Sequence, residues 1–333
     1  MQATAPKPLA LVIGATGAFG GETARQLAAA GWRVRALHRR PDEARAQMQS
    51  SDGLNAEWVK GDAMVREDVL RAADGARVIV HAANPPGYRN WRGLVGPMLE
   101  NTIAAGIAQG ARILLPGNVY NYGPDARGEI AEEAPQNPIT GKGRIRVAME
   151  QRLKQAGQEG AKVLILRAGD FFGGAYRTSW MGQIMVQAGK PVRSLTYPGP
   201  LMVRHAWAYL PDVAATAVRL LDKEAELSAV ASFHFAGQAL SGHELVAAFE
   251  RVVGQRLPVR PFPWFVMAAA GPFNETFREL FEMRYLWRET VLMDNRRLVE
   301  TLGAEPHTPI DAALEATLRG LGCLGEASAA QAA

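Results

Sequence analysis

The sequence has few of the features on which several classes of protein depend. Its 333 residues include one cysteine, Cys323, so neither a disulfide framework nor a thiolate metal site can form within one chain. The six histidines show no His-Glu-x-x-His spacing, and we expect no metal site. The longest apolar stretch, residues 264–273, is interrupted by Gly271 and Pro272 and is shorter than the ~20 residues that cross a bilayer.

Charge of one sign and targeting signals are also scarce. The net charge is +4, and the densest basic cluster is confined to residues 33–40, so we expect no nucleic-acid partner. Residues 1–8 lack the charged, apolar and cleavage regions of a signal peptide, and we expect a cytoplasmic protein without a membrane partner. What remains, 48% hydrophobic and 21% charged residues, indicates a globular protein of about two domains.

A glycine-rich turn follows the first apolar segment, residues 9–13. Gly14 would allow a tight turn, Gly17 would let backbone N–H groups approach a pyrophosphate, and Gly20 would let a helix pack closely on the strand. Such turns also serve as plain connectors, but the flanking strand and helix patterns favour a dinucleotide site. The candidate cofactor-binding residues of this turn are Gly14, Thr16, Gly17, Ala18, Phe19 and Gly20.

The next two strand patterns end in polar residues. Arg39 and Arg40 follow the second strand, where an NAD enzyme usually has an acidic residue, and either guanidinium would suit a 2′-phosphate. This favours NADP over NAD, with a solvated basic loop as the alternative. Asp62 follows the third strand and would accept a hydrogen bond from the adenine amino group, or else cap a helix over residues 65–73.

Strand and helix patterns alternate through the first half of the chain, which predicts an α/β fold with a parallel sheet covered on both faces. The expected strands are 9–13, 33–38, 56–60, 77–80, 112–115 and 162–167. We expect a dinucleotide-binding domain over residues 1–167 and a mainly substrate-binding domain over 168–333, with parts of about 205–240 returning to the sheet. Ser241 to Glu244 has the spacing of a capping box, and Thr308 and Pro309 should cap and begin the last helix.

Together these patterns resemble the extended short-chain dehydrogenase/reductase family, which includes NAD-dependent epimerases and dehydratases. The matching motifs are Gly14-x-x-Gly17-x-x-Gly20, Arg39, Gly61-Asp62, His81-Ala82-Ala83, Tyr122-Gly123, Glu132 to Pro135, Glu150, Arg167, Phe172-Gly173 and Pro211 to Ala214. The resemblance implies a Rossmann-type doubly wound parallel sheet with a smaller C-terminal mixed α/β substrate domain. It also implies a nicotinamide dinucleotide, with Ala82 and Ala83 among its contacts.

The catalytic residues of that family are replaced in this chain. The family uses a Tyr-x-x-x-Lys pair and a Ser or Thr, and the corresponding positions hold Lys142, Arg146 and Asn118. Lys142 is a candidate general acid if burial and Arg146 lower its pKa, Arg146 would bind ribose hydroxyls or a substrate anion, and Asn118 would donate to a carbonyl oxygen. Tyr120 or Tyr122 would supply the missing phenol. The alternatives are a solvated helix face for the two cations and a packing role for the tyrosines.

Four further segments have open interpretations. Asp170 follows the sixth strand, where the family's loop meets the nicotinamide, and would orient cofactor or substrate or cap a turn. The aromatic and arginine side chains of residues 84–92 suit an anionic or aromatic substrate, or belong to a plain surface loop. Residues 204–207 either reach the substrate or pack, and residues 264–281 form core, an apolar lid or a substrate wall.

The leading hypothesis is an NADP(H)-dependent oxidoreductase with an atypical acid/base group, acting on a small carbonyl or hydroxyl substrate. The alternatives are a sugar-nucleotide epimerase or dehydratase, and a non-catalytic protein that senses NADP(H). A homodimer is a further expectation from the families that the chain resembles.

Overall fold

The computed structural model describes residues 7–52, 54–85, 91–174, 176–273 and 275–324. Its contacts divide the chain into two compact units. The first comprises Met1–Gly117, Ile145–Arg167 and Ala214–Phe233, and the second comprises Asn118–Arg144, Ala168–Val213 and His234–Ala333. The chain therefore passes between the units more often than one boundary at residue 167 implies.

Alternating strands and helices build the first unit. Its elements, some of which extend into the second unit, are β1 (Leu9–Ile13), α1 (Ala18–Ala29), β2 (Arg33–His38), α2 (Pro41–Asp52), β3 (Glu57–Lys60), α3 (Arg66–Ala72), β4 (Ala76–His81), α4 (Trp91–Gln109), β5 (Arg112–Asn118), α5 (Gly141–Gln158), β7 (Lys162–Ala168), α6 (Leu210–Asp222) and β11 (Val230–Phe235). Within the described residues, seven strands form one sheet in the order β11-β7-β5-β4-β1-β2-β3. The pairs β1/β2, β1/β4, β2/β3 and β4/β5 are parallel.

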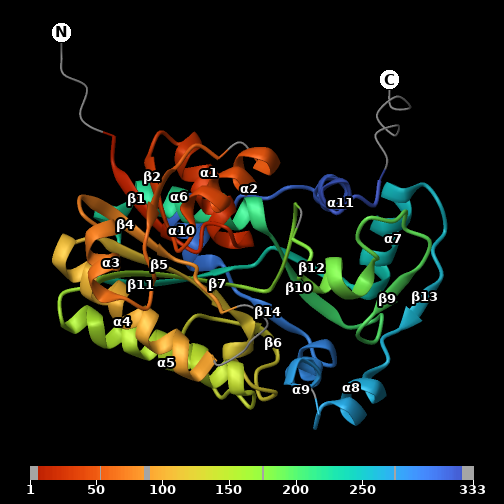
Figure 1. Ribbon diagram of the computed structural model, residues 1–333. Coiled ribbons are helices and arrows are strands. Elements are labelled where there is room, and N and C mark those ends of the chain that lie inside the picture. Colours follow the sequence, from red (N-terminus) through yellow and green to blue (C-terminus); the bar gives the residue numbers. More distant parts are fainter. Residues whose placement is uncertain (1–6, 53, 86–90, 175, 274, 325–333) are drawn as a thin grey trace. The chain divides into compact units, whose positions relative to one another are not determined.

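Helices cover both faces of this sheet. The helices α1, α2 and α6 lie on one face and α3, α4 and α5 on the other (Figure 1). Every residue of β1 is buried, as expected for a strand that packs on both sides. The predicted Rossmann-type doubly wound sheet is thus confirmed. The strand order reverses between β1 and β4, and open α/β sheets bind ligands at the carboxyl ends of the strands at such a point.

The second unit is a mixed α/β structure. Its strands are β6 (Gly128–Ile130), β8 (Asp170–Phe172), β9 (Leu195–Tyr197), β10 (Arg204–Tyr209), β12 (Gln238–Ser241), β13 (Val259–Pro261) and β14 (Val291–Met293). Its helices are α7 (Gly242–Val253), α8 (Trp264–Ala270), α9 (Glu275–Glu282), α10 (Arg296–Leu302) and α11 (Ile310–Gly320). Short helical turns occur at Val119–Asn121, Met181–Met185 and Met283–Trp287 here, and at Glu224–Glu226 in the first unit. The strand β10 pairs antiparallel with β12 and parallel with β8, over a core that includes Phe172, Trp207, Phe249 and Trp287.

One of the two predicted helix starts is correct. Ser241 Oγ accepts from the backbone N–H of Glu244, and the Glu244 carboxylate accepts from the N–H of Ser241, so the capping box is confirmed. The last helix does begin in the predicted segment, but one residue later: Pro309 is the N-cap residue and the helix starts at Ile310, so the individual roles expected of Thr308 and Pro309 were wrong. The Thr308 hydroxyl and N–H instead each donate to the Asp212 carboxylate, at 2.7 Å.

The apolar segment 264–281 is only partly buried. Met267 is buried, whereas the Phe265 residue is 76% exposed. None of the described helices combines the length and the apolar content needed to cross a bilayer.

Candidate functional site

The glycine turn of the first unit leaves no room for larger residues. Gly14 has φ +95°, and a Cβ on it would lie 2.6 Å from the carbonyl carbon of Ala82. A Cβ on Gly20 would lie 2.2 Å from the carbonyl oxygen of Gly14. Gly17 donates its N–H to that oxygen at 2.9 Å and is the N-cap residue of α1. The close approach of α1 to the ends of β1 and β4 therefore requires glycine at positions 14 and 20.

This turn fits a dinucleotide pyrophosphate. Gly17 is exposed, Thr16 and Ala18 are half-buried, and Phe19 packs inward. The first turn of α1 has no acidic residue to offset the positive end of the helix dipole. Exposed backbone N–H groups at a helix N-terminus form an anion site of the kind that phosphates occupy.

A second polar region lies where β2 and β3 end. A hollow of about 380 Å³ is lined by Arg39, Lys60, Gly61, Asp62, Asp68 and Arg71. Asp68 accepts hydrogen bonds from the Asp62 N–H and from the Arg71 guanidinium, and these bonds lower the pKa of Asp68. The charge of Arg71 is thus offset within the wall of the hollow.

The two arginines that follow β2 differ in their partners. The Arg40 guanidinium lies 3.0 Å from the Glu43 carboxylate. Arg39 and Lys60 are exposed, and neither forms an ion pair with any described residue. Both cations are therefore available to an anionic ligand.

Asp62 is not a helix cap, so that alternative was wrong. The helix α3 begins at Arg66 after the N-cap residue Val65, and no side chain caps it. Asp62 Oδ1 accepts from the Met64 N–H at 3.0 Å, because the carboxylate closes the turn that precedes the helix. Asp62 still lines the hollow.

The two cations at the replaced catalytic positions are buried on α5. Lys142 is 6% exposed and Arg146 is 5% exposed, so the interpretation as a solvated helix face was wrong. In the second unit, Lys142 Nζ lies 3.7 Å from Glu279 Oε2 on α9.

Arg146 belongs to the first unit and is held by three groups there. Its guanidinium donates to the Pro116 carbonyl at 3.4 Å and to Asn84 Oδ1 at 3.1 Å. It also lies 5.4 Å from the centre of the Trp91 ring, within cation–π range. Asn84 and Trp91 belong to the segment 84–92 that the sequence suggests as a substrate contact; α4 begins at Trp91, and residues 86–90 lie outside the described residues.

The candidate amide donor Asn118 and the candidate phenols Tyr120 and Tyr122 follow one another from the end of β5 onward, in the second unit. Asn118 is half-buried at the end of β5, and Tyr120 is partly buried in the turn that follows. Tyr122 is 0% exposed, and its hydroxyl donates to His234 Nε2 at 2.8 Å. The prediction that Tyr122 supplies a catalytic phenol was wrong, because its hydroxyl is enclosed and paired.

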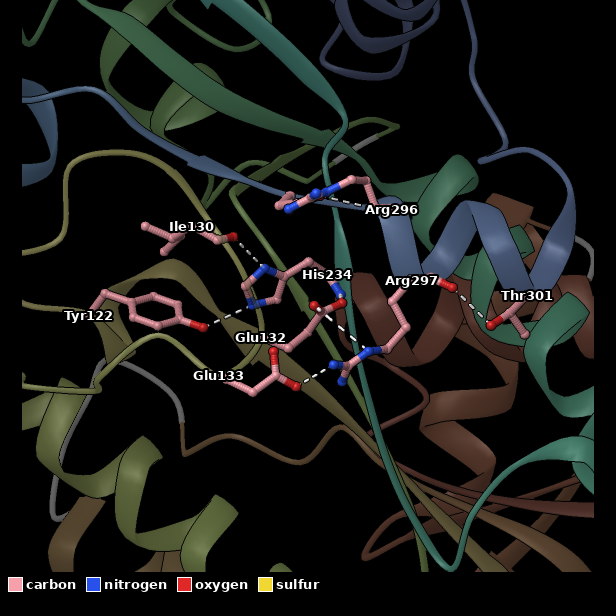
Figure 2. Close-up of polar contacts among 9 residues, drawn as sticks. Tyr122, Ile130, Glu132, Glu133, His234, Arg296, Arg297 and Thr301 are labelled. Atoms are coloured by element: carbon pink, nitrogen blue, oxygen red, sulfur yellow. Dashed lines mark hydrogen bonds and ion pairs between the residues drawn. The ribbon is translucent and has the colours of Figure 1, made fainter.

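His234 is the centre of a buried network that the sequence did not reveal. Figure 2 shows its ring between the Tyr122 hydroxyl and the carbonyl of Ile130. A carbonyl can only accept, so Nδ1 carries the hydrogen, donated at 3.0 Å, and Nε2 is the acceptor for Tyr122. The His234 N–H donates to Glu132 Oε1 at 3.0 Å. These bonds join His234 to the segment around β6, and both lie in the second unit.

Asp170 also has a partner that the sequence did not predict. It begins β8 and accepts from His205 Nε2 on β10 at 2.7 Å, so the turn-cap alternative was wrong. The His205 ring stacks on Trp287 with 3.9 Å between ring centres and 5° between planes. This contact fixes the imidazole against the core of the second unit.

The described residues hold no cluster of three or more His, Cys, Asp or Glu side chains suited to a metal ion. Comparisons with known proteins identify a family. The NAD dependent epimerase/dehydratase family matches residues 10–231. A search of curated proteins finds no match.

Solved structures share the fold over nearly the whole chain. UDP-glucose 4-epimerase from Brucella ovis in complex with NAD has a TM-score of 0.74 and 18% identity, covering 95% of this chain and 98% of that one. UDP-glucose 4-epimerase from Bifidobacterium longum in complex with NAD+ and UDP has a TM-score of 0.73 and 15% identity, covering 95% and 100%. UDP-glucuronic acid 4-epimerase from Bacillus cereus in complex with NAD has a TM-score of 0.73 and 17% identity, covering 94% and 98%. Because the family match extends over two thirds of the sequence, this chain belongs to the NAD-dependent epimerase/dehydratase family.

Proposed function

We propose that the protein is an NADP(H)-dependent oxidoreductase that acts on a small carbonyl or hydroxyl substrate. The glycine turn would bind the pyrophosphate, with Thr16, Gly17 and Ala18 offering backbone N–H groups. Ala82 and Ala83 follow β4 beside this turn and would contact the dinucleotide. When bound, the coenzyme supplies hydride exchange at its nicotinamide.

The choice of NADP rests on Arg39 and Lys60, two cations that line the hollow and form no ion pair within the described part of the chain. The solved structures named above contain NAD. A ribose with a free 2′-hydroxyl is usually held by an acidic residue at the end of the second strand, and this chain has Arg39 there. A 2′-phosphate would gain charge-assisted hydrogen bonds from Arg39, while Asp62 would accept from the adenine amino group.

The proposed catalytic roles follow the chemistry of the replaced positions. Lys142, an ammonium beside Glu279, would donate a proton to the substrate oxygen during carbonyl reduction, and Asn118 would donate a hydrogen bond to the same oxygen. Arg146 would bind coenzyme hydroxyls. We assign Asp170 to orientation of coenzyme or substrate through the carboxylate oxygen that His205 leaves free.

Titration calorimetry with NADPH and NADH tests the coenzyme assignment. A charge-assisted contact contributes about 1.5–3 kcal/mol, so Arg39→Ala should weaken NADPH binding about 10- to 100-fold and NADH binding much less. Arg45→Ala is the matched control, since Arg45 is an exposed arginine of α2 that does not line the hollow. Equal losses for the two nucleotides would refute the phosphate assignment.

A sugar-nucleotide epimerase or dehydratase is the second candidate. It is favoured by the family and by structural neighbours described as UDP-sugar epimerases. Such an enzyme regenerates its coenzyme in each cycle, whereas the leading proposal predicts net formation or loss of NADPH. Incubation with UDP-glucose and UDP-glucuronic acid, followed by product analysis and by the absorbance of reduced nicotinamide, separates the two.

The same assays address a non-catalytic NADP(H) sensor. Wild-type protein that binds NADPH but converts nothing in a broad panel of carbonyls and sugar nucleotides would favour the sensor. Turnover that survives Lys142→Ala unchanged would rule out the acid/base role of Lys142.

A further inference from the structure

Three cations lie at the amino ends of neighbouring strands of the first unit. Arg77 is the second residue of β4, Arg112 is the first residue of β5 and Lys162 is the first residue of β7. These strands are neighbours in the large sheet, and the glycine turn follows the opposite, carboxyl end of β1. A hollow of about 470 Å³ lies here, lined by residues of the first unit alone: Arg77, Gly110, Arg112, Lys162, Glu224, Ala225, Leu227 and Ala229.

One carboxylate, that of Glu224, is shared by all three cations. Its oxygens lie 3.3 Å from Arg77 Nη2 and 3.8 Å from both Arg112 Nε and Lys162 Nζ. Strong charge-assisted hydrogen bonds between nitrogen and oxygen are about 2.7–2.9 Å long, so none of these contacts is a close one. Three cations and one carboxylate leave two positive charges without a counterion among the residues that line the hollow.

Arg112 is the buried cation of the three. It is 2% exposed, and its Nη1 donates to the carbonyls of Val163 and Ser228, both at 3.0 Å. Its Nε is buried and has no hydrogen-bond partner in the described part of the chain. Burial lowers the pKa of Arg112, and the charge of Glu224 offsets this effect only in part. Because a guanidinium keeps its proton in proteins, the wall of the hollow holds a fixed positive charge that is incompletely compensated.

We propose that this hollow binds a phosphate dianion, either free or at the end of a small organic molecule. A phosphomonoester carries about two negative charges at neutral pH, which matches the two cations that lack a counterion, whereas a single carboxylate would neutralise only one of them. Arg77 and Lys162 would donate to the phosphate oxygens, and the buried charge of Arg112 would attract the same group. The apolar side chains of the lining, Leu227 foremost, would contact an organic substituent.

Titration of the full-length protein with phenyl phosphate, followed by amide ¹H and ¹⁵N shifts, tests this site. The ligand should shift the amides of Gly110, Ala225 and Leu227, which line the hollow. The double variant Arg77→Ala with Lys162→Ala should bind at least tenfold more weakly, because it removes two charge-assisted contacts. The variant Glu224→Gln should bind more tightly, because it removes the negative charge beside the phosphate.

The matched control is the double variant Arg33→Ala with Lys154→Ala. Arg33 also begins a strand of the sheet, β2, and its side chain is 59% exposed at 3.8 Å from Glu57, against 65% for Arg77. Lys154 is an exposed lysine of α5, and neither residue lines the hollow. This control should bind phenyl phosphate with unchanged affinity.

A parallel titration with inorganic phosphate distinguishes the two sources of the dianion. Tighter binding of phenyl phosphate supports an organic monoester, and equal affinity supports free phosphate. The absence of shifts with both ligands would overturn the proposal, and so would equal shifts with sodium acetate at the same ionic strength or an unchanged affinity in the double variant Arg77→Ala with Lys162→Ala. Phosphate that binds at the other hollow would shift the amides of Lys60 and Gly61 instead, so this outcome is separate from that of the coenzyme assignment.

Discussion

Replacing Glu150 by glutamine should remove a large part of the stability of the first unit. The Arg167 guanidinium donates to both Glu150 oxygens, with Nε contacts of 3.0 and 3.1 Å and an Nη2 contact of 2.7 Å. The two side chains are 1% and 2% exposed. Breaking such a buried pair by removing one charge costs about 3–5 kcal/mol, because the remaining charge stays buried.

The size of this effect follows from burial, and an exposed pair supplies the control. Arg251 donates to both oxygens of Asp311 at 2.8 and 2.7 Å, but these side chains are 55% and 46% exposed. Asp311→Asn should therefore cost at most about 1 kcal/mol, since solvent screens the interaction. The two ion pairs have similar hydrogen-bond geometry and differ in burial. The difference between their losses of stability therefore measures the effect of desolvating the charges.

Urea unfolding followed by far-ultraviolet circular dichroism, together with amide exchange in β5 and β7, measures the loss in Glu150→Gln. The amide-exchange rates show which of the two units loses its structure in the variant. The double replacement Glu150→Met with Arg167→Met should cost much less than the sum of the single replacements, because apolar side chains can substitute for a buried pair. A loss no larger than that of Asp311→Asn, or a double variant equal to the sum, would contradict this reasoning.

Two further predictions concern buried rings. Tyr122→Phe leaves His234 Nε2 without its donor, so the free energy of unfolding should fall by about 1–3 kcal/mol in urea titrations, and an unchanged value would contradict the buried network. Because the folded pKa of His81 is about 4 and its ordinary value is 6.5, the unfolded chain binds a proton first as the pH falls. Stability should then drop by roughly 3 kcal/mol between these pH values, and a His81→Phe variant that keeps this part of the acid slope would refute the assignment.

Local patterns were sufficient to predict the sheet and its glycine turn. The apolar residues of β1 are followed directly by Gly14, Gly17 and Gly20, and the physical requirement for a tight turn lies within those few residues. The sequence also predicts basic residues at the end of β2. Only the structure distinguishes Arg39 from Arg40, because Glu43 pairs with Arg40.

Contacts between distant segments were not predictable in this way. The bonds of Asp170 with His205, Tyr122 with His234, and Thr308 with Asp212 join residues 35, 112 and 96 positions apart. The periodicity of apolar residues does not predict such pairs, because they depend on how strands and loops pack in the folded chain. The same limit explains why Tyr122 looked like a catalytic phenol and Thr308 like a helix cap.

The three-segment composition of the first unit affects how the protein can be made and divided. The strand β11 forms the edge of the large sheet next to β7, yet it is synthesised only after residues 168–229. Assembly of that sheet cannot finish in simple order along the nascent polypeptide, and such long-range pairing slows folding. A fragment that stops at residue 167 would leave β7 as an uncovered edge, which invites aggregation. A version of the first unit that folds on its own should join its three segments in one polypeptide, rather than end at residue 167.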